Sequence, residues 1–495
     1  MDGKRSGESD VMLQEINYVP TRTECSDNQQ LKAENNVKRS DTPFLWFVVL
    51  TVILLMLVGC TSFGWASPAV IKLKSENPEV NPLGRPITTV EISVLAGMPV
   101  LSSLIGSYMI PRLADIVGRK TSLQITAIGM FASIVGIAFS SKIYLLIISC
   151  AILSNLFAGT WGILPIYLTE ICEDHNRTKF GCLMSACIPL GQLYCYVFGP
   201  PFSLKYFTLI TAAPLLPFFA LFLFAPESPV YLLSKGKKED CMKALMKLRR
   251  NKSKTELEID FDRIKLSLRD TMDTKPDLTA LVKTRESRIG LLISMMPVSG
   301  QYLCGVPVMM SLLAPIFNES STLLSGNMIA VIVGVVKLLT FIITSSIIEK
   351  TGRKPMLVLS SVGSGISTLV IGLYFYLKYI NSVFIEKLQW LPIASVFLYI
   401  ISYSLGLGPI PQCVPSEMFL PHQRSTAQAF ISAYANALYA FYLFVYPLLA
   451  EAIGSYSCFW IFSGTCFAGA VVFYYVMPET RGKSILEIQE MLKRY

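Results

Sequence analysis

One lysine, Lys337, lies in the middle of a long apolar run, residues 326–348. A lysine at the centre of a membrane-spanning helix costs at least ~2.5–3.5 kcal/mol, and roughly a dozen residues on either side keep its amine from reaching a membrane surface. The interior of no apolar run contains an aspartate or glutamate that could neutralise it. Lys337 is therefore expected to face a water-filled interior and contact a solute there, including an anionic one. The alternative is a structural lysine that bonds carbonyl groups freed near Pro307.

Acidic residues and arginines recur at matching positions in two halves of the chain. Glu170 precedes Arg177 by seven residues, and Glu417 precedes Arg424 by seven. A single exposed ion pair contributes only ~0–1 kcal/mol, so several must act together to bias an equilibrium between two conformations. We expect a gate of ion pairs between the halves. Its residues are Asp115, Arg119, Glu170, Arg177, Glu227, Glu349, Arg353, Glu417, Arg424 and Glu479. Anchoring in the membrane would explain the basic residues alone, but not the acids at a fixed spacing.

The other reactive residue types form no pattern typical of catalysis or metal binding. The chain has two histidines, His175 and His422, and twelve cysteines, most of them in apolar runs. A buried cysteine usually behaves as a small apolar side chain. We expect no enzyme activity, no metal and no cofactor. The net charge of +9 is spread over loops, so no nucleic-acid partner is expected either.

Twelve apolar runs must position these residues. Only 16% of the chain is charged, whereas soluble proteins are nearer a quarter charged, so the lipid bilayer is the expected surrounding. A membrane-spanning helix needs about 20 mainly apolar residues. The runs are 43–66, 89–110, 121–140, 143–169, 180–202, 206–225, 289–315, 326–348, 355–377, 389–412, 427–449 and 455–477. These runs predict an all-α polytopic membrane protein with twelve transmembrane helices.

The distribution of Lys and Arg predicts the orientation in the membrane. With the N-terminus in the cytoplasm, the cytoplasmic segments hold 35 of these residues and the outside loops hold seven. Cytoplasmic loops carry such an excess in most membrane proteins. We predict a multi-pass plasma-membrane protein with both termini cytoplasmic. Of the three sequons, only Asn318-Glu319-Ser320 falls outside, so Asn318 is the predicted glycosylation site.

Composition divides the chain into five segments. The first is polar without apolar periodicity, which predicts a disordered cytoplasmic tail and no signal peptide. Pro226 to Arg288 is the only long polar segment between the apolar runs. The predicted segments are a tail 1–42, a six-helix bundle 43–225, a cytoplasmic linker 226–288, a six-helix bundle 289–477 and a cytoplasmic tail 478–495.

Three cytoplasmic motifs recur six runs apart. Gly118-Arg119-Lys120 matches Gly352-Arg353-Lys354, and Pro226-Glu227-Ser228 matches Pro478-Glu479-Thr480. The third match is the acid–arginine spacing described above. Such a parallel repeat is typical of transporters in which one bundle rocks against the other.

These motifs resemble the sugar porter branch of the major facilitator superfamily over residues 43–490. The resemblance rests also on Pro165 to Glu170 and on Gly408-Pro409-Ile410-Pro411. Gly64 to Pro68 is similar to the facilitated trehalose transporter subgroup. The resemblance implies two six-helix bundles around a central cavity, and a short helical cytoplasmic domain between them.

The resemblance also implies sugar-binding positions, most of which carry other residues here. Gln301 keeps the family's glutamine, whereas Lys337 replaces an asparagine. Helical spacing adds Gln192, which lies on one face with Ser185. The candidate substrate-binding residues are Ser185, Gln192, Gln301, Tyr302, Lys337, Ser404, Gln412 and Asn436. The polar groups on these helices could instead bond neighbouring helices.

The predicted function is transport of a sugar (hexose or trehalose-like) or a related polyol by facilitated diffusion through alternating access. A proton-coupled carrier usually needs a carboxylate inside the membrane, and the apolar runs lack one. The alternatives are a carrier of another small, including anionic, solute and a non-transporting nutrient sensor. The expected partners are the small-molecule substrate and the bilayer, and the protein is expected to work as a monomer.

Overall fold

The structure is a computed structural model that describes residues 42–272, 280–318, 324–419, 421–479, 481 and 485–494. Apart from Thr42, the predicted N-terminal tail lies outside the described residues. Thr42 caps the first helix by accepting a hydrogen bond from the backbone N–H of Leu45. Its hydroxyl also donates to the carbonyl of Leu248, at 2.8 Å.

All secondary structure in the described ranges is helical. A helix satisfies its backbone N–H and C=O groups internally, which the hydrocarbon core of a bilayer requires. Eleven helical segments in these ranges are long and apolar enough to cross a membrane. This confirms the predicted all-α polytopic fold.

The first half of the chain forms six crossings, and the sixth is broken into two short helices. They are α2 (Pro43–Leu73), α3 (Thr89–Val117), α4 (Arg119–Ala138), α5 (Ile143–Ile171), α6 (Asp174–Phe198), and α7 (Leu204–Thr211) with α8 (Leu215–Phe222). Trp65 joins α2 to α7, because its indole N–H donates to the hydroxyl of Thr208 at 3.0 Å.

The second half repeats this order, with two broken crossings. They are α13 (Arg285–Leu303), α14 (Val306–Ser311) and α15 (Leu313–Asn318), then α16 (Gly326–Thr351), α17 (Arg353–Tyr379), α18 (Leu391–Leu405) with α19 (Ile410–Met418), α20 (Pro421–Ile453) and α21 (Ser455–Val476). A 3₁₀ helix, Val383–Leu388, lies between α17 and α18, and α22 (Ile485–Arg494) follows the last crossing.

The seventh predicted run, 289–315, differs most from its prediction as a continuous helix. The first piece already begins at Arg285, inside the predicted linker. The break comes at Gly305, whose φ of 84° few other residues adopt. A Cβ at this position would also overlap the ring of Phe462. This crossing is not among the eleven long apolar segments.

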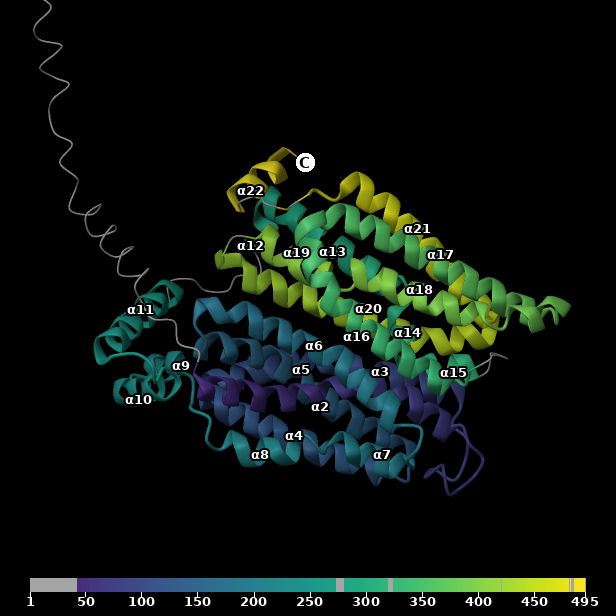
Figure 1. Cartoon of the computed structure of the whole chain (residues 1–495), viewed down its shortest axis with the longest axis horizontal. Helices are drawn as coiled ribbons and strands as arrows, with labels where there is room; N and C mark the ends of the chain where they lie inside the picture. Colours follow the sequence, from purple (N-terminus) through teal and green to yellow (C-terminus); the bar gives the residue numbers. More distant parts are fainter. Residues whose placement is uncertain are drawn as a thin grey trace, which may run out of the picture.

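The linker forms a small helical unit at one end of the molecule (Figure 1). It contains α9 (Pro229–Ser234), α10 (Lys238–Leu248) and α11 (Lys254–Met272), and α12 (Ala280–Lys283) leads into the second half. Leu232, Cys241, Ala244, Leu245 and Leu257 form its own apolar core. We call this end of the molecule the linker end and the opposite end the distal end.

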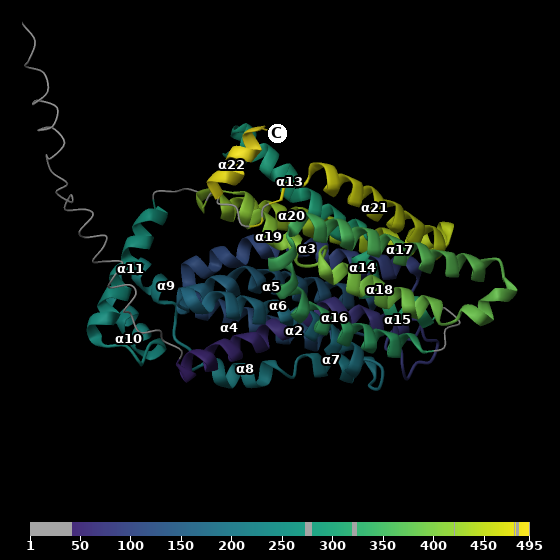
Figure 2. The ribbon, with the colours of Figure 1, turned by 45° about the horizontal axis from the view of Figure 1, so that its top comes forward.

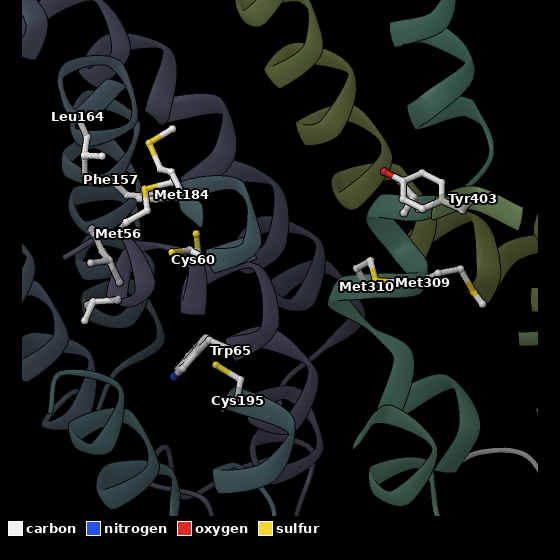
Figure 3. Close-up of a cluster of buried hydrophobic side chains, with 14 of the residues drawn as sticks. Met56, Cys60, Trp65, Phe157, Leu164, Met184, Cys195, Met309, Met310 and Tyr403 are labelled. Atoms are coloured by element: carbon white, nitrogen blue, oxygen red, sulfur yellow. The ribbon is translucent and has the colours of Figure 1, made fainter. Parts of the chain in front are cut away.

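The two halves lie side by side, with the first half in purple to teal and the second in green to yellow (Figures 1 and 2). They meet where α3 packs on α20 and where α6 packs on α16. The second crossing of the first half, α3, thus packs on the fifth crossing of the second half, α20. The fifth crossing of the first half, α6, packs on the second crossing of the second half, α16, as an internal repeat predicts. Figure 3 shows core side chains of both halves, with Trp65 and Cys195 in the first and Met310 and Tyr403 in the second.

Candidate functional site

Lys337 lies on α16 at the boundary between the halves. Its ammonium Nζ donates a hydrogen bond to Oε1 of Gln192 on α6, at 2.7 Å. It also lies 3.3 Å from the sulfur of Met310 on α14. Lys337 is partly buried, whereas Gln192 is buried. The structure thus brings two predicted substrate-binding residues into direct contact across the two halves.

Close packing of α6 and α16 positions this pair. Gly334 lies one turn before Lys337 on α16, and a Cβ there would be 3.1–3.4 Å from Leu193 and Tyr196 of α6. On the other side of α6, the backbone of Gln192 packs against Gly64 of α2. Small residues let helices approach closely in membranes. The two glycines therefore set where the amide of Gln192 meets the ammonium of Lys337.

Other contacts between the halves lie towards the distal end. The hydroxyl of Tyr196 donates to the carbonyl of Met310 at 2.6 Å. The backbone N–H of Ala314 donates to the hydroxyl of Ser67 at 3.1 Å, near the distal end of α2. With the Lys337–Gln192 contact, these hydrogen bonds hold the halves together from mid-membrane to the distal end. Tyr196 and Ser67 were not predicted as site residues, because a tyrosine or serine in an apolar run gives no distinctive signal.

Gln301 joins α13 to the break between α18 and α19. Its side-chain amide donates to the hydroxyl of Tyr403 at 3.1 Å and to the carbonyl of Gly408 at 3.0 Å. Gln301 is buried. The predicted contact of Gln301 with a solute therefore stays a prediction, since both amide hydrogens already bond neighbouring segments.

Aromatic side chains from both halves gather around Tyr439 of α20. The ring of Tyr302 lies 5.8 Å from that of Tyr439, and Phe63 of α2 contacts it at 6.1 Å between ring centroids. The hydroxyls of Tyr439 and Ser311 are 3.1 Å apart. Asn436 lies one turn earlier on α20, on the face that carries Tyr439. Tyr302 and Asn436 are therefore placed towards the contact between the halves.

The other predicted substrate-binding residues are less closely connected. The hydroxyl of Ser185 donates to the carbonyl of Gly181 in its own helix, at 3.0 Å. Ser404 is buried in α18, and Gln412 is exposed on α19. Among the described residues, the side chains of Ser404, Gln412 and Asn436 have no hydrogen-bond partner. Their part in binding stays a prediction.

Charged residues of the first half form one cluster at the linker end. Both Nε and Nη2 of Arg119 lie 3.1 Å from Glu170 carboxylate oxygens, and Asp115 lies 3.1 Å from the same guanidinium. The backbone N–H groups of Arg119 and Lys120 donate to Glu227 at 2.9 Å. We call Asp115, Arg119, Glu170 and Glu227 the first charge cluster.

The second half repeats this arrangement. Arg353 pairs with Glu417 at 2.7 Å. The backbone N–H groups of Arg353 and Lys354 donate to Glu479 at 3.0 and 3.1 Å. The carboxylates of Glu227 and Glu479 thus each accept at the N-terminus of a helix, where the backbone favours an anion. We call Arg353, Glu417 and Glu479 the second charge cluster.

The expected gate of ion pairs between the halves differs from what the structure shows. Each ion pair of the two charge clusters joins elements of one half. The physical reason is that Gly118 and Gly352, with φ of 107° and 99°, open each helix start to a carboxylate of the same half. The side chains of Arg177, Glu349 and Arg424 lie outside the described part of the chain. A gating role for these ten residues stays a prediction.

Sequence reasoning missed a buried charge cluster that attaches the linker unit to the first half. Glu173, between α5 and α6, lies 2.8 Å from Lys252 and 3.6 Å from Arg249 of the linker. Asp260 of α11 lies 2.5 Å from Arg249 and 2.9 Å from Lys252. All four side chains are at most 14% exposed. No spacing between Glu173 and the linker residues could have indicated this contact.

Two further features lie away from the contact between the halves. Asn318 is exposed at the end of α15, and its Oδ1 accepts from the backbone N–H of Gly326 at 2.8 Å. A shallow hollow of about 620 Å³ lies between α4, α7 and α8, and its lining includes Phe131, Tyr206 and Leu216. The lining of this hollow is almost entirely apolar and includes no predicted site residue.

Comparisons with known proteins agree with this architecture. The profile of the family described as "Sugar (and other) transporter" matches residues 15–492. The chain is 27% identical over 485 residues to "Facilitated trehalose transporter Tret1" of Aedes aegypti, covering 96% of this chain but only 58% of that protein. It is 26% identical over 479 residues to the protein of the same name from Polypedilum vanderplanki, covering 96% and 94% of the two chains.

Solved structures of similar fold include the xylose transporter XylE from E. coli. Its inward-open conformation superposes with a TM-score of 0.74 at 21% identity, over 90% of this chain and 99% of that one. A partially occluded inward-open conformation gives a TM-score of 0.70 at 20% identity, over 88% of this chain and all of that one. These likenesses show the fold of two six-helix halves.

Proposed function

The chain belongs to the sugar (and other) transporter family, and from this membership we propose that it carries a sugar (hexose or trehalose-like) or a related polyol across the plasma membrane. The carrier works by facilitated diffusion through alternating access, as a monomer. The observation that carries the proposal is the polar contact between two duplicated halves, centred on Lys337 and Gln192. The similarity to facilitated trehalose transporters supports a disaccharide or a hexose as the solute.

The two halves supply the mechanism. In each charge cluster, an arginine pairs with acidic residues, and a carboxylate accepts hydrogen bonds from the first residues of a helix in the same half. These contacts join helices of one half, so each half moves as a unit. The hydrogen bonds near the distal end close that side in this structure. A solute then exchanges with the linker end, which the excess of Lys and Arg predicts to be cytoplasmic. Rocking of the halves breaks the distal contacts and opens the other side.

Facilitated diffusion follows from the chemistry of the interior. A proton-coupled carrier usually holds the proton on a carboxylate within the membrane. Among the described residues, the side chains that form hydrogen bonds across the contact between the halves supply an ammonium, an amide and hydroxyls. None of these is a carboxylate, which supports transport down a gradient.

Uptake into proteoliposomes tests the proposal. The purified protein should carry radiolabelled trehalose or glucose with saturable kinetics, and an imposed proton gradient should leave the rate unchanged. Empty liposomes provide the control. Accumulation that needs the proton gradient would contradict facilitated diffusion. Uptake of sugar acids but not of neutral sugars would favour an anionic solute instead, and no uptake of any of them would favour a sensor.

A further inference from the structure

The Lys337–Gln192 hydrogen bond differs from the other contacts between the halves in the mobility of its donor. Lysine carries its ammonium on a flexible four-carbon chain. The backbone that carries Gln192, by contrast, is fixed, because it packs against Gly64 and the thiol of Cys195, one turn further on α6, donates to the carbonyl of Thr61. The ammonium can therefore change its acceptor while both helices stay in place.

The ammonium also has unused bonding capacity in this structure. It carries three N–H donors. Its described contacts are the Gln192 oxygen at 2.7 Å and the Met310 thioether at 3.3 Å. A thioether is a weak acceptor, and neither partner carries a negative charge. A hydroxyl oxygen of a sugar is a better acceptor than the sulfur and, like the amide oxygen, is an uncharged oxygen acceptor.

We propose that Lys337 and Gln192 form a bridge between the halves that the solute releases. A hydroxyl oxygen of the bound sugar takes the place of Gln192 Oε1 as acceptor for the Lys337 ammonium. The bridge then opens, and the halves separate towards the distal side. This proposal rests on the proposed function, because it needs a solute between the halves.

The neighbouring bond between Tyr196 and Met310 provides an internal comparison. Its donor is a hydroxyl on a rigid ring, and its acceptor is a backbone carbonyl. The carbonyl is fixed by its helix, and the tyrosine has fewer rotatable bonds than a lysine with which to follow a solute. This bond therefore stabilises the closed distal side whether or not a solute is bound, and its loss should not abolish the response to a sugar.

Hydrogen–deuterium exchange of the protein in lipid nanodiscs measures the bridge directly. The reporters are peptides that cover α14 and α15, residues 306–318, with and without trehalose or glucose. In the wild-type protein, the transported sugar should raise exchange there. Lys337→Met should raise exchange about tenfold without any sugar, as expected for loss of a hydrogen bond from a charged group, and sugar should add little. Thr340→Val on the same helix is the matched control, because among the described residues its hydroxyl bonds only the carbonyl of Val336.

A second variant strengthens the bridge instead of removing it. Gln192→Glu places a carboxylate against the ammonium, and the sugar must then compete with a charged acceptor. Exchange in 306–318 should fall below that of the wild type, sugar should no longer raise it, and uptake should drop about tenfold or more. Tyr196→Phe should raise exchange without sugar but keep the rise on adding sugar. Because one variant loosens the distal side and another tightens it, misfolding cannot produce the full pattern.

Two results would overturn the bridge. One is an equal rise on adding sugar in wild type and Lys337→Met, and the other is unchanged exchange in both Lys337→Met and Gln192→Glu. Failure of the proposed function looks different. In that case the wild type takes up neither sugar, while the sugar-free exchange of Lys337→Met and Gln192→Glu still reports whether the bridge holds the halves together.

Discussion

Among single residues, Gln301 illustrates how a position typical of sugar binding can serve the helices themselves. Its amide bonds Tyr403 of α18 and the carbonyl of Gly408, which lies between α18 and α19. A break between two helices leaves backbone carbonyls without a partner in the helix. In this chain Gln301 supplies the missing donor. A sugar oxygen that accepts from the amide of Gln301 must therefore compete with these two acceptors.

Replacing Gln301 by leucine should lower stability measurably. The change leaves the partly buried carbonyl of Gly408 and the hydroxyl of the buried Tyr403 without this donor, at a cost of about 1–3 kcal/mol. Thermal unfolding of the purified protein in detergent should show a reduced Tm. Gln412→Leu is the control, because this exposed side chain has no hydrogen-bond partner among the described residues and its loss should change stability by no more than about 0.5 kcal/mol. Equal Tm values for the two variants would contradict the structural role of Gln301.

Lys337 shows what could be predicted about a residue and what could not. Its depth in the membrane and its isolation from acidic residues follow from the sequence alone. Its partner does not, because the contact with Gln192 depends on how closely α6 approaches α16 at Gly334. Two helices that are far apart in the chain leave no sequence signal for such an approach.

At the scale of elements, the linker unit behaves as part of the first half. The buried charges of Glu173, Arg249, Lys252 and Asp260 attach it to the connection between α5 and α6. Thr42 adds a second attachment through the carbonyl of Leu248. The unit is therefore expected to move with the first half when the halves rock.

Substituting Glu173 by glutamine should detach the linker unit. The change leaves two buried cations facing one carboxylate, and breaking such a buried pair costs about 3–5 kcal/mol. Limited proteolysis should then cut within 229–272 faster than in the wild type. Asp240→Asn provides a matched control, since it breaks an exposed pair with Lys243 that contributes about 0–1 kcal/mol. Equal cutting of both variants would argue against the attachment.

Cys241 reports the folding of the linker unit itself. Burial in the core of the unit raises the pKa of the Cys241 thiol to about 11, although nearby Arg249 opposes the shift. A raised thiol pKa keeps the sulfur protonated and unreactive at neutral pH. Maleimide labelling of Cys241, followed by mass spectrometry, should be slow at pH 7 and rise as the pH approaches 11.

Leu245→Ala should remove that protection. Leu245 is fully buried beside Cys241 in the same core, and deleting such a side chain costs about 2–5 kcal/mol. Labelling at pH 7 should then approach the rate found in urea. An unchanged labelling rate in this variant would mean that the core of the unit does not protect the thiol.

At the scale of the whole molecule, the sequence repeat predicted the architecture well, but it did not predict which residues contact each other. Two halves with matched motifs appear as expected, and the apolar runs locate the crossings. The broken seventh crossing escaped prediction because a single residue, Gly305, changes the backbone direction within an apolar run. The partners of Arg119 and Arg353 were also not predicted. The motifs show which residues are charged, but not whether these residues pair within one half or between the halves.

Glycosylation tests the orientation of the molecule in the membrane. Asn318 is exposed at the distal end, and Asn251 is exposed in the linker unit. Expression in a eukaryotic cell should give a protein whose apparent mass falls after treatment with an N-glycosidase, and Asn318→Gln should abolish that shift. Asn251→Gln is the control and should leave the shift unchanged. Modification of Asn251 instead of Asn318 would indicate the opposite orientation in the membrane.

The position of Glu227 in the chain has a consequence for how the protein is made. The first charge cluster draws its last carboxylate from the segment directly after α8, so it is complete before any helix of the second half has left the ribosome. Domains generally fold as units during synthesis, the N-terminal one first. The first six crossings can thus settle in the membrane as a finished unit, and Glu479, which follows α21, completes the second charge cluster in the same way. The residues of each charge cluster therefore find their partners within their own half as the chain is made.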